Sequence, residues 1–278
     1  MKYFFLVRPH QWLKNLMLFF PPFLSGAFLP AAMISHGLIP FAAFCSASSA
    51  NYILNDLIDC RKDSAHPAKC SRPLPSGQVK ASVAVVLCSI FTVLAVVLSL
   101  QVSKVFLFYV GIYLGLSAAY SALLKQMPIV DVFCIAFGFV LRLYGGGEAF
   151  GVQISDWLFL SVFLLATFLS FGKRYSERRQ LGDNAGAHRR TLEEYPDGFL
   201  EGALYLSGST VLVTYAMYAI SKPVMVYTVP LCTFGLLRYM MRIKTGKGGD
   251  PTDALLSDIP LLITGILWTM LVGWCVYS

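Results

Sequence analysis

The chain has 278 residues, of which 56% are hydrophobic and 13% are charged, and its mean hydropathy is +0.65. Soluble domains carry about 25% charged residues, so this composition excludes a water-soluble globular protein. The aromatic content of 14% excludes a disordered chain. The apolar runs are long and do not alternate with polar residues, which argues against a transmembrane β-barrel. We therefore expect an all-α polytopic membrane protein.

The apolar runs predict about nine transmembrane helices, because one span needs roughly 20 apolar residues. The predicted spans are residues 16–34, 39–59, 81–100, 105–124, 129–145, 157–172, 199–220, 223–241 and 259–277. Pro21 and Pro22 predict a kink in the first of these spans. We expect residues 1–278 to form a single integral membrane domain.

The distribution of basic residues predicts the orientation of the spans. If the N-terminus lies inside, every lysine and arginine except Lys104, Lys222 and Arg142 falls on the inner side. Cytoplasmic loops hold such an excess, so we predict the N-terminus in and the C-terminus out. Most of the formal charge of +7 reflects this asymmetry, and no nucleic-acid partner is needed to explain it.

A cluster of acidic residues closes the second predicted span, where the chain reads Asn55-Asp56-Leu-Ile-Asp59-Cys-Arg-Lys-Asp63. The three aspartates share roughly 60° of one helical face, and Asn55 flanks them. Like charges on one face repel each other, whereas Mg²⁺ bridges such carboxylates to phosphate oxygens. Because the cluster begins inside an apolar run, where ionisable groups are costly, we favour a metal site over a solvated helix end.

This aspartate cluster resembles the first aspartate-rich motif of the UbiA superfamily of intramembrane prenyltransferases. Residues 68–77 are similar to the loop that follows this motif in the superfamily. Residues 8–15, 120–131 with Arg142, and 249–258 resemble the decaprenyl-phosphate phosphoribosyltransferase branch. Residues 173–179 lack the second aspartate-rich motif of the aromatic prenyltransferases. The resemblance implies a UbiA-like bundle of nine helices with its site open to the cytoplasm.

The resemblance also implies a reaction, the transfer of 5-phosphoribose from phosphoribosyl diphosphate to a polyprenyl (decaprenyl-like) phosphate with release of diphosphate. The expected cofactor is Mg²⁺ held by Asn55 and Asp59, with Mn²⁺ as a substitute, and the expected catalytic residues are Asp56, Asp59 and Asp63. The lipid phosphate is already anionic, so catalysis needs positioning and charge stabilisation rather than a strong base. Such a transferase would lie in a bacterial-type inner (plasma) membrane among membrane lipids, and a homo-oligomer is left open.

Cations in the same segments are predicted to hold the phosphate groups. The candidates for phosphoribosyl diphosphate are Lys14, Lys69, Arg72, Tyr120, Lys125 and Arg142, and those for the lipid phosphate are Lys69, Lys173 and Arg174. Several also have a structural explanation. Lys14 could anchor the first span at the membrane surface, and Lys173 and Arg174 are favourable charges at a helix C-terminus.

Arg142 is a basic residue well inside a predicted span. It lies 11 residues after Asp131, so about 16 Å further along the helix. An arginine inside the bilayer is a functional-site candidate by default, although pairing with Glu148 would be the structural alternative.

Two other functions remain open at this point. An aromatic prenyltransferase that uses a polyprenyl diphosphate donor would share the fold and the aspartate cluster. A lipid transporter without enzymatic activity is the remote alternative, because transporter sites tend to lie near the bilayer midplane, whereas this cluster ends at the inner surface.

Overall fold

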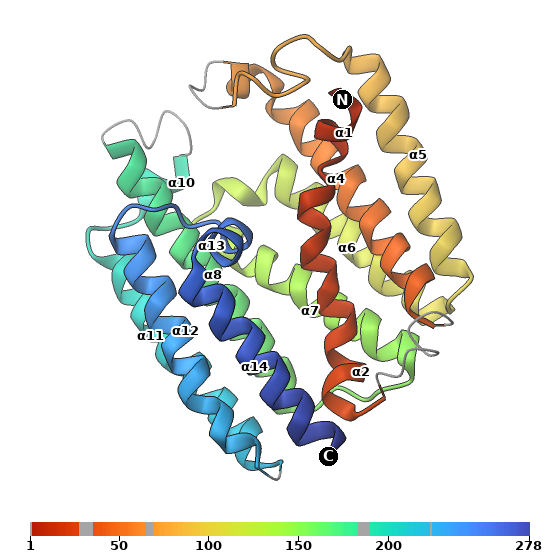
Figure 1. The fold of residues 1–278 in the computed structure, drawn as a ribbon. Coiled ribbons are helices and arrows are strands. Elements are labelled where there is room, and N and C mark those ends of the chain that lie inside the picture. The colour runs from red at the N-terminus through yellow and green to blue at the C-terminus, as the bar shows by residue number, and fades with distance from the viewer. Residues whose placement is uncertain (1, 28–35, 65–68, 183–189, 223) are drawn as a thin grey trace. The chain divides into compact units, whose positions relative to one another are not determined.

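The computed structural model of the chain describes residues 2–27, 36–64, 69–182, 190–222 and 224–278. In these ranges every regular element is a helix, as the sequence predicts (Figure 1). Contacts divide the chain into two compact units. Unit 1 comprises Met1–Pro22, Ala27–Met127 and Leu141–Gln153, and unit 2 comprises Phe23–Gly26, Pro128–Val140 and Ile154–Ser278.

Helices lie over the described parts of all nine predicted ranges. The longer elements are the 3₁₀ helix η1 (Pro9–Phe19) and α4 (Leu38–Ser64), α5 (Ala81–Leu100), α6 (Lys104–Ala122), α7 (Val130–Phe150), α8 (Asp156–Leu181), α11 (Phe199–Ile220), α12 (Val229–Lys244) and α14 (Ile259–Tyr277). The shorter ones are α1 (Lys2–Val7), α2 (Phe20–Ser25), η3 (Leu124–Gln126), α10 (Arg190–Glu194), η5 (Met225–Thr228) and α13 (Pro251–Ser257).

Six of the described helices are long and apolar enough to cross a membrane, namely α5, α6, α7, α8, α11 and α14. Serines and asparagines dilute the apolar residues of α4, and α12 has only 16 residues. The predicted number of nine spans and their orientation therefore stay predictions. Residues 28–34 of the first predicted span and Pro223 of the eighth lie outside the described residues.

The N-terminal segment of unit 1 lies antiparallel along α4. A 3₁₀ helix has three residues per turn, so Trp12, Asn15 and Leu18 of η1 form one ridge. Trp12 Nε1 donates to Ser49 Oγ at 3.0 Å, and Asn15 Nδ2 donates to Cys45 Sγ at 3.3 Å. This ridge brings two polar side chains and one apolar side chain of η1 against α4.

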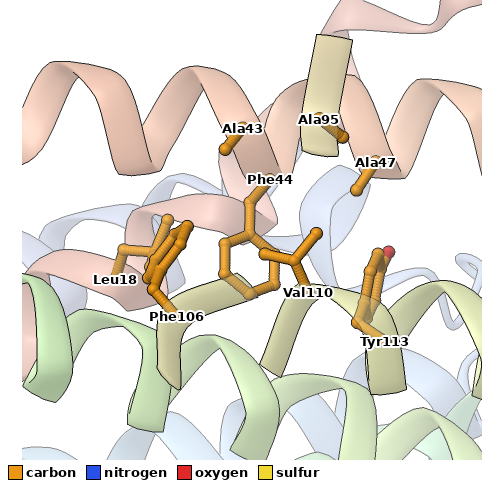
Figure 2. Close-up of a cluster of buried hydrophobic side chains, with 8 residues drawn as sticks. All are labelled: Leu18, Ala43, Phe44, Ala47, Ala95, Phe106, Val110 and Tyr113. Atoms are coloured by element: carbon orange, nitrogen blue, oxygen red, sulfur yellow. The ribbon is translucent and has the colours of Figure 1, made fainter. Parts of the chain in front are cut away.

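Phe44 lies at the centre of the apolar core of unit 1 (Figure 2). Its ring packs edge-on against Phe106 with 5.6 Å between the centroids, and the Tyr113 ring lies at the same distance. Between membrane helices such rings stabilise the fold through close van der Waals packing rather than through removal of apolar surface from water. The other buried members of this core are Leu18, Ala43, Ala47, Ala95 and Val110. The core thus joins η1, α4, α5 and α6.

Two glycines of α7 allow its second half to lie against η1 and α4. A Cβ atom on Gly146 would stand 2.1 Å from the carbonyl oxygen of Leu18, and one on Gly145 would stand 2.8 Å from the Phe44 ring. Neither position has room for a side chain. Arg142 precedes Gly146 by one helical turn, so the same close approach brings its guanidinium group towards η1.

Unit 2 packs α8, α11, α12 and α14 around its own apolar core, whose members include Phe168, Leu204, Leu236 and Ile243. Asp258 connects two of its helices. Its carboxylate accepts from the Leu261 N–H at the start of α14 and forms a two-point ion pair with Arg238 of α12, at 2.9 and 3.0 Å. The Arg238 guanidinium holds the pKa of the Asp258 carboxyl below its usual range.

Replacing Gly146 by alanine should destabilise unit 1 by roughly 1–3 kcal/mol, because the added methyl group would overlap backbone rather than a movable side chain. Thermal unfolding in detergent checks this. The matched control is Gly111→Ala on α6, where a Cβ atom meets nothing within 4 Å and removal of a glycine should be neutral or stabilising. Equal unfolding temperatures for the two variants would contradict the close approach.

The ion pair of Asp258 should make the stability of unit 2 depend on pH. A lowered pKa in the folded state contributes stability above the unfolded value of about 3.9, and this contribution is lost as the pH falls through the folded value. We expect Arg238→Gln to lower the unfolding temperature at pH 7 and to lower it less as the pH falls towards 3. A difference from the wild type that persists unchanged at pH 3 would exclude this pair as the cause.

Candidate active site

The ammonium group of Lys125 lies where oxygen atoms of Asn55 and Asp59 converge. Its Nζ is 2.6 Å from both carboxylate oxygens of Asp59 and 3.3 Å from Asn55 Oδ1. Asn55 and Asp59 are four residues apart on α4, so their side chains are neighbours, and Lys125 comes from η3 after α6. The side chains of Lys125 and Asp59 are 14% and 19% exposed, so water screens the pair only weakly.

Asp56 and Asp63 of the same cluster are paired with guanidinium groups. Arg8 Nη2 lies 2.5 Å from Asp56 Oδ1, and Arg72 Nη1 bridges both carboxylates, at 3.3 Å from Asp56 and 2.6 Å from Asp63. Lys69 Nζ lies 3.8 Å from Asp63. Because Asp56 is 1% exposed, loss of its partners would leave a buried charge uncompensated. These two aspartates therefore position cations of the N-terminal segment and of the loop after α4.

Arg8 is a site residue that the sequence did not single out. Its backbone is left-handed, with φ 54°, where the chain turns from α1 into η1. Such a conformation is strained by about 1–3 kcal/mol in a residue other than glycine, and here the Asp56 ion pair and the Tyr52 ring, 5.2 Å away, hold it. Two signals were available, namely its place in the branch-like segment 8–15 and its position directly before Pro9, which opens η1.

The donor set at Asn55 and Asp59 fits a hard divalent cation. Carboxylate and amide oxygens are the ligands that such ions prefer, and they already converge on one cationic atom, Lys125 Nζ. Over the described part of the chain, no group of three or more His, Cys, Asp or Glu side chains could hold a metal ion by itself. The protein would thus supply only part of the coordination shell, as is usual for Mg²⁺ ions that are bound together with substrate phosphates.

A buried polar cluster surrounds Arg142 deeper in unit 1. Arg142 Nε donates to Asn15 Oδ1 at 2.7 Å, and Nη2 donates to Tyr113 Oη at 2.7 Å and to Ser48 Oγ at 3.4 Å. Arg142 is 6% exposed and Asn15 is fully buried. The guanidinium group therefore hydrogen-bonds neutral oxygen atoms on η1, α4 and α6, and it has a clear structural role there.

Four polar residues of α4 connect the Arg142 cluster with the Lys125 site. Ser48, Asn51, Asn55 and Asp59 lie within roughly 80° of one helical face and span about 16 Å, and we call them the polar stripe. Asn51 stands between the two ends. Its Nδ2 atom is buried and lies near the Tyr113 hydroxyl, but it makes no hydrogen bond of normal geometry in the described parts of the chain. An unsatisfied buried donor is costly, so a ligand oxygen at this point would be stabilising.

Two further predicted residues lie beside the polar stripe. Tyr120 follows Tyr113 by two turns of α6 and therefore occupies the same face, which packs on α4. Tyr113 contacts Ser48, and α4 and α6 run in the same direction, so Tyr120 lies near the level of Asn55. Lys14 is half-buried on η1, next to Asn15.

In unit 2, Lys173 and Arg174 were both predicted to bind the lipid phosphate, but their surroundings differ. Arg174 is 1% exposed and forms ion pairs with Asp131 at 2.7 Å and with Glu177 at 2.6 Å. Lipid contact would require both ion pairs to break, and the predicted role of Arg174 stays a prediction. Lys173 is 36% exposed, and its Nζ lies 3.1 Å from Asp250, so it remains accessible.

Tyr195 completes the buried pair of Asp131 and Arg174. Its hydroxyl donates to Asp131 at 3.2 Å and accepts from the Ile129 N–H at 2.7 Å. Burial raises the pKa of Tyr195 to about 12, so the hydroxyl keeps its proton at neutral pH. Ile129 has a φ of 67°, and this hydrogen bond holds the strained turn that precedes α7.

Comparison with known proteins shows how far the resemblance extends. Residues 19–259 match the model of the UbiA prenyltransferase family. The chain is 30% identical over 290 residues to the decaprenyl-phosphate phosphoribosyltransferase of Mycolicibacterium smegmatis, with coverage of 98% of this chain and 91% of that protein. It is 28% identical over 277 residues to the decaprenyl-phosphate phosphoribosyltransferase of Mycobacterium tuberculosis, with coverage of 96% and 91%.

The fold is also that of solved structures in the same family. A UbiA homolog from Archaeoglobus fulgidus, bound to GPP and Mg²⁺, matches 100% of both chains with a TM-score of 0.78 at 21% identity. The comparisons confirm the predicted family and the all-helical class, and they place the chain among enzymes rather than lipid transporters. This chain belongs to the UbiA prenyltransferase family of integral membrane enzymes.

Proposed function

We propose that the protein transfers 5-phosphoribose from phosphoribosyl diphosphate to a polyprenyl phosphate and releases diphosphate. The observation that carries this proposal is the polar stripe of α4, which has the Lys125 site at one end and Arg142 at the other. A donor with phosphate groups at both ends needs cations at two separated places. The two relatives named decaprenyl-phosphate phosphoribosyltransferase support the same reaction, because each aligns with at least 96% of this chain.

The diphosphate end of the donor would lie at Asn55 and Asp59. Mg²⁺ held there, with Mn²⁺ as a substitute, would neutralise charge on the leaving diphosphate. Lys125, Lys69 and Arg72 would bind the diphosphate oxygens, since charge-assisted hydrogen bonds to phosphate are strong. In this proposal Asp59 acts directly on the metal, while Asp56 and Asp63 act through the cations that they hold.

The 5-phosphate end would lie towards Lys14 and Arg142, with Tyr120 and the Asn51 amide beside the ribose. The lipid phosphate oxygen would attack C1 of the ribose as the bond from C1 to the diphosphate oxygen breaks. No base is required, because the attacking oxygen already carries a charge at neutral pH. Catalysis would then come from positioning and from charge stabilisation.

Two partly exposed lysines, Lys69 of unit 1 and Lys173 of unit 2, are each a candidate for the acceptor phosphate. Lys69 and Lys173 are 41% and 36% exposed, so each could turn to a lipid phosphate at little cost. Arg174 is a further candidate, whose contact with the lipid phosphate would require its ion pairs with Asp131 and Glu177 to break. We further propose that residues 1–278 form one transferase domain in a bacterial plasma membrane, with the active site facing the cytoplasm.

A second candidate is prenyl transfer from a polyprenyl diphosphate to an aromatic acceptor. The fold favours it, because the A. fulgidus homolog binds GPP and Mg²⁺. Such a donor has phosphate at one end only. It would use the Lys125 end of the polar stripe and would not require a cation at Arg142. The choice of donor therefore separates the two candidates.

Incubation of the purified protein with Mg²⁺ and a polyprenyl phosphate should incorporate label from phosphoribosyl diphosphate and not from a prenyl diphosphate. We expect EDTA to stop the reaction, Mg²⁺ or Mn²⁺ to restore it, and Asp59→Ala to lower kcat/KM by at least about a hundredfold. The control is Asp156→Asn, which changes an exposed carboxylate at the start of α8. Incorporation from the prenyl donor alone would favour the second candidate.

Arg142→Gln should raise the KM for phosphoribosyl diphosphate by roughly tenfold or more, because a charged hydrogen bond to phosphate contributes about 1.5–3 kcal/mol. The matched control is Tyr113→Phe, which removes one hydrogen-bond partner of Arg142 but no cation. Both variants should lower the unfolding temperature, and only Arg142→Gln should change the KM strongly. If both lower the temperature and neither changes the KM, Arg142 is purely structural.

A further inference from the structure

The position of Lys125 within the candidate metal site has a consequence of its own. Both carboxylate oxygens of Asp59 and the amide oxygen of Asn55 point at its Nζ. These are the same atoms that would ligate a divalent ion, at about 2.0–2.1 Å for Mg²⁺. An ion at that distance from the oxygens would stand against the ammonium group. Two cations cannot share these oxygen atoms, since their repulsion in a half-buried site is large.

We propose that Lys125 competes with the metal for the same ligands. Its ammonium group binds the oxygen atoms of Asn55 and Asp59 until the metal arrives together with a phosphorylated donor. This inference rests on the proposed function, because it takes Asn55 and Asp59 as the metal ligands. The metal alone would have to displace the ammonium group without offering it a new partner. A metal–diphosphate complex brings its own anion, to which the displaced ammonium group can turn.

The structure shows why Lys125, rather than a neighbouring arginine, is the group that exchanges. Arg8 and Arg72 hold Asp56, which is 1% exposed, so their departure would strand a buried carboxylate. Asp59 is 19% exposed and receives the incoming ion as compensation. A lysine is also suited to such an exchange, since its ammonium group is a compact charge on a flexible stem.

The exchange couples the metal to the donor. Diphosphate should raise the affinity for the metal, and by thermodynamic reciprocity the metal should raise the affinity for diphosphate by the same factor. Without Lys125, the metal site would be open in the absence of donor, and much of this coupling would disappear. The competitor thus discourages binding of a bare ion that has no substrate to activate.

Titration of Mn²⁺ into the full-length protein in detergent tests the inference without an activity measurement. Free Mn²⁺ is followed by electron paramagnetic resonance, with no donor present. We expect Lys125→Met to bind Mn²⁺ at least about tenfold more tightly than the wild type. Lys125→Arg, which keeps a cation, should still bind Mn²⁺ as weakly as the wild type does. The matched control is Lys62→Met, which removes an exposed charge three residues from Asp59 on the same helix and should change the affinity by less than about threefold.

Addition of inorganic diphosphate supplies the second readout, because it should tighten Mn²⁺ binding more in the wild type than in Lys125→Met. Equal or weaker Mn²⁺ binding by Lys125→Met, together with loss of binding in Asp59→Asn, would overturn the competitor role and leave the metal site standing. If Asp59→Asn binds Mn²⁺ as well as the wild type does, the metal site and the proposed function fail together. Lys125→Gln serves in the same way if the methionine variant does not fold.

Discussion

The polar face of α4 is the constraint on which unit 1 depends. A helix that carries serines, asparagines and aspartates within an apolar segment must find a partner for each of them, since an unpaired buried polar group costs free energy. The N-terminal segment supplies many of these partners, through Arg8, Trp12 and Asn15. The remaining ones come from the loop after α4, from α6, from the turn after it and from α7. The need to pair the polar side chains of α4 therefore determines both the packing of unit 1 and the formation of the candidate site.

The fold and one half of the candidate site could be predicted from the sequence because their signals are local. Apolar runs indicated the helices, and the spacing of Asn55, Asp56, Asp59 and Asp63 placed them near one helical face. The same argument could not separate Asn55 and Asp59, which bind Lys125, from Asp56 and Asp63, which bind arginines. That division depends on which cations the tertiary structure brings next to each of these residues.

Other polar contacts join distant parts of the chain within each unit. Arg142 and Asn15 are 127 residues apart, and Tyr195 and Asp131 are 64 apart, so no local pattern could pair them. Arg174 illustrates the converse. The sequence predicted the end of a span just before this arginine, where a surface charge is typical, yet α8 continues to Leu181 and the arginine is buried with Asp131. The pairing of Arg8 with Asp56 could not be predicted either, because it requires a left-handed residue between α1 and a 3₁₀ helix.

The 3₁₀ geometry of η1 limits how this segment can vary in length. With three residues per turn, insertion or deletion of one residue between Arg8 and Leu18 would rotate everything after it by about 120°. Asn15 would then leave Ser48 and Arg142, and Leu18 would leave the Phe44 core. Three inserted residues would restore the face but lengthen the segment by about 6 Å. This segment should therefore tolerate substitutions better than insertions or deletions.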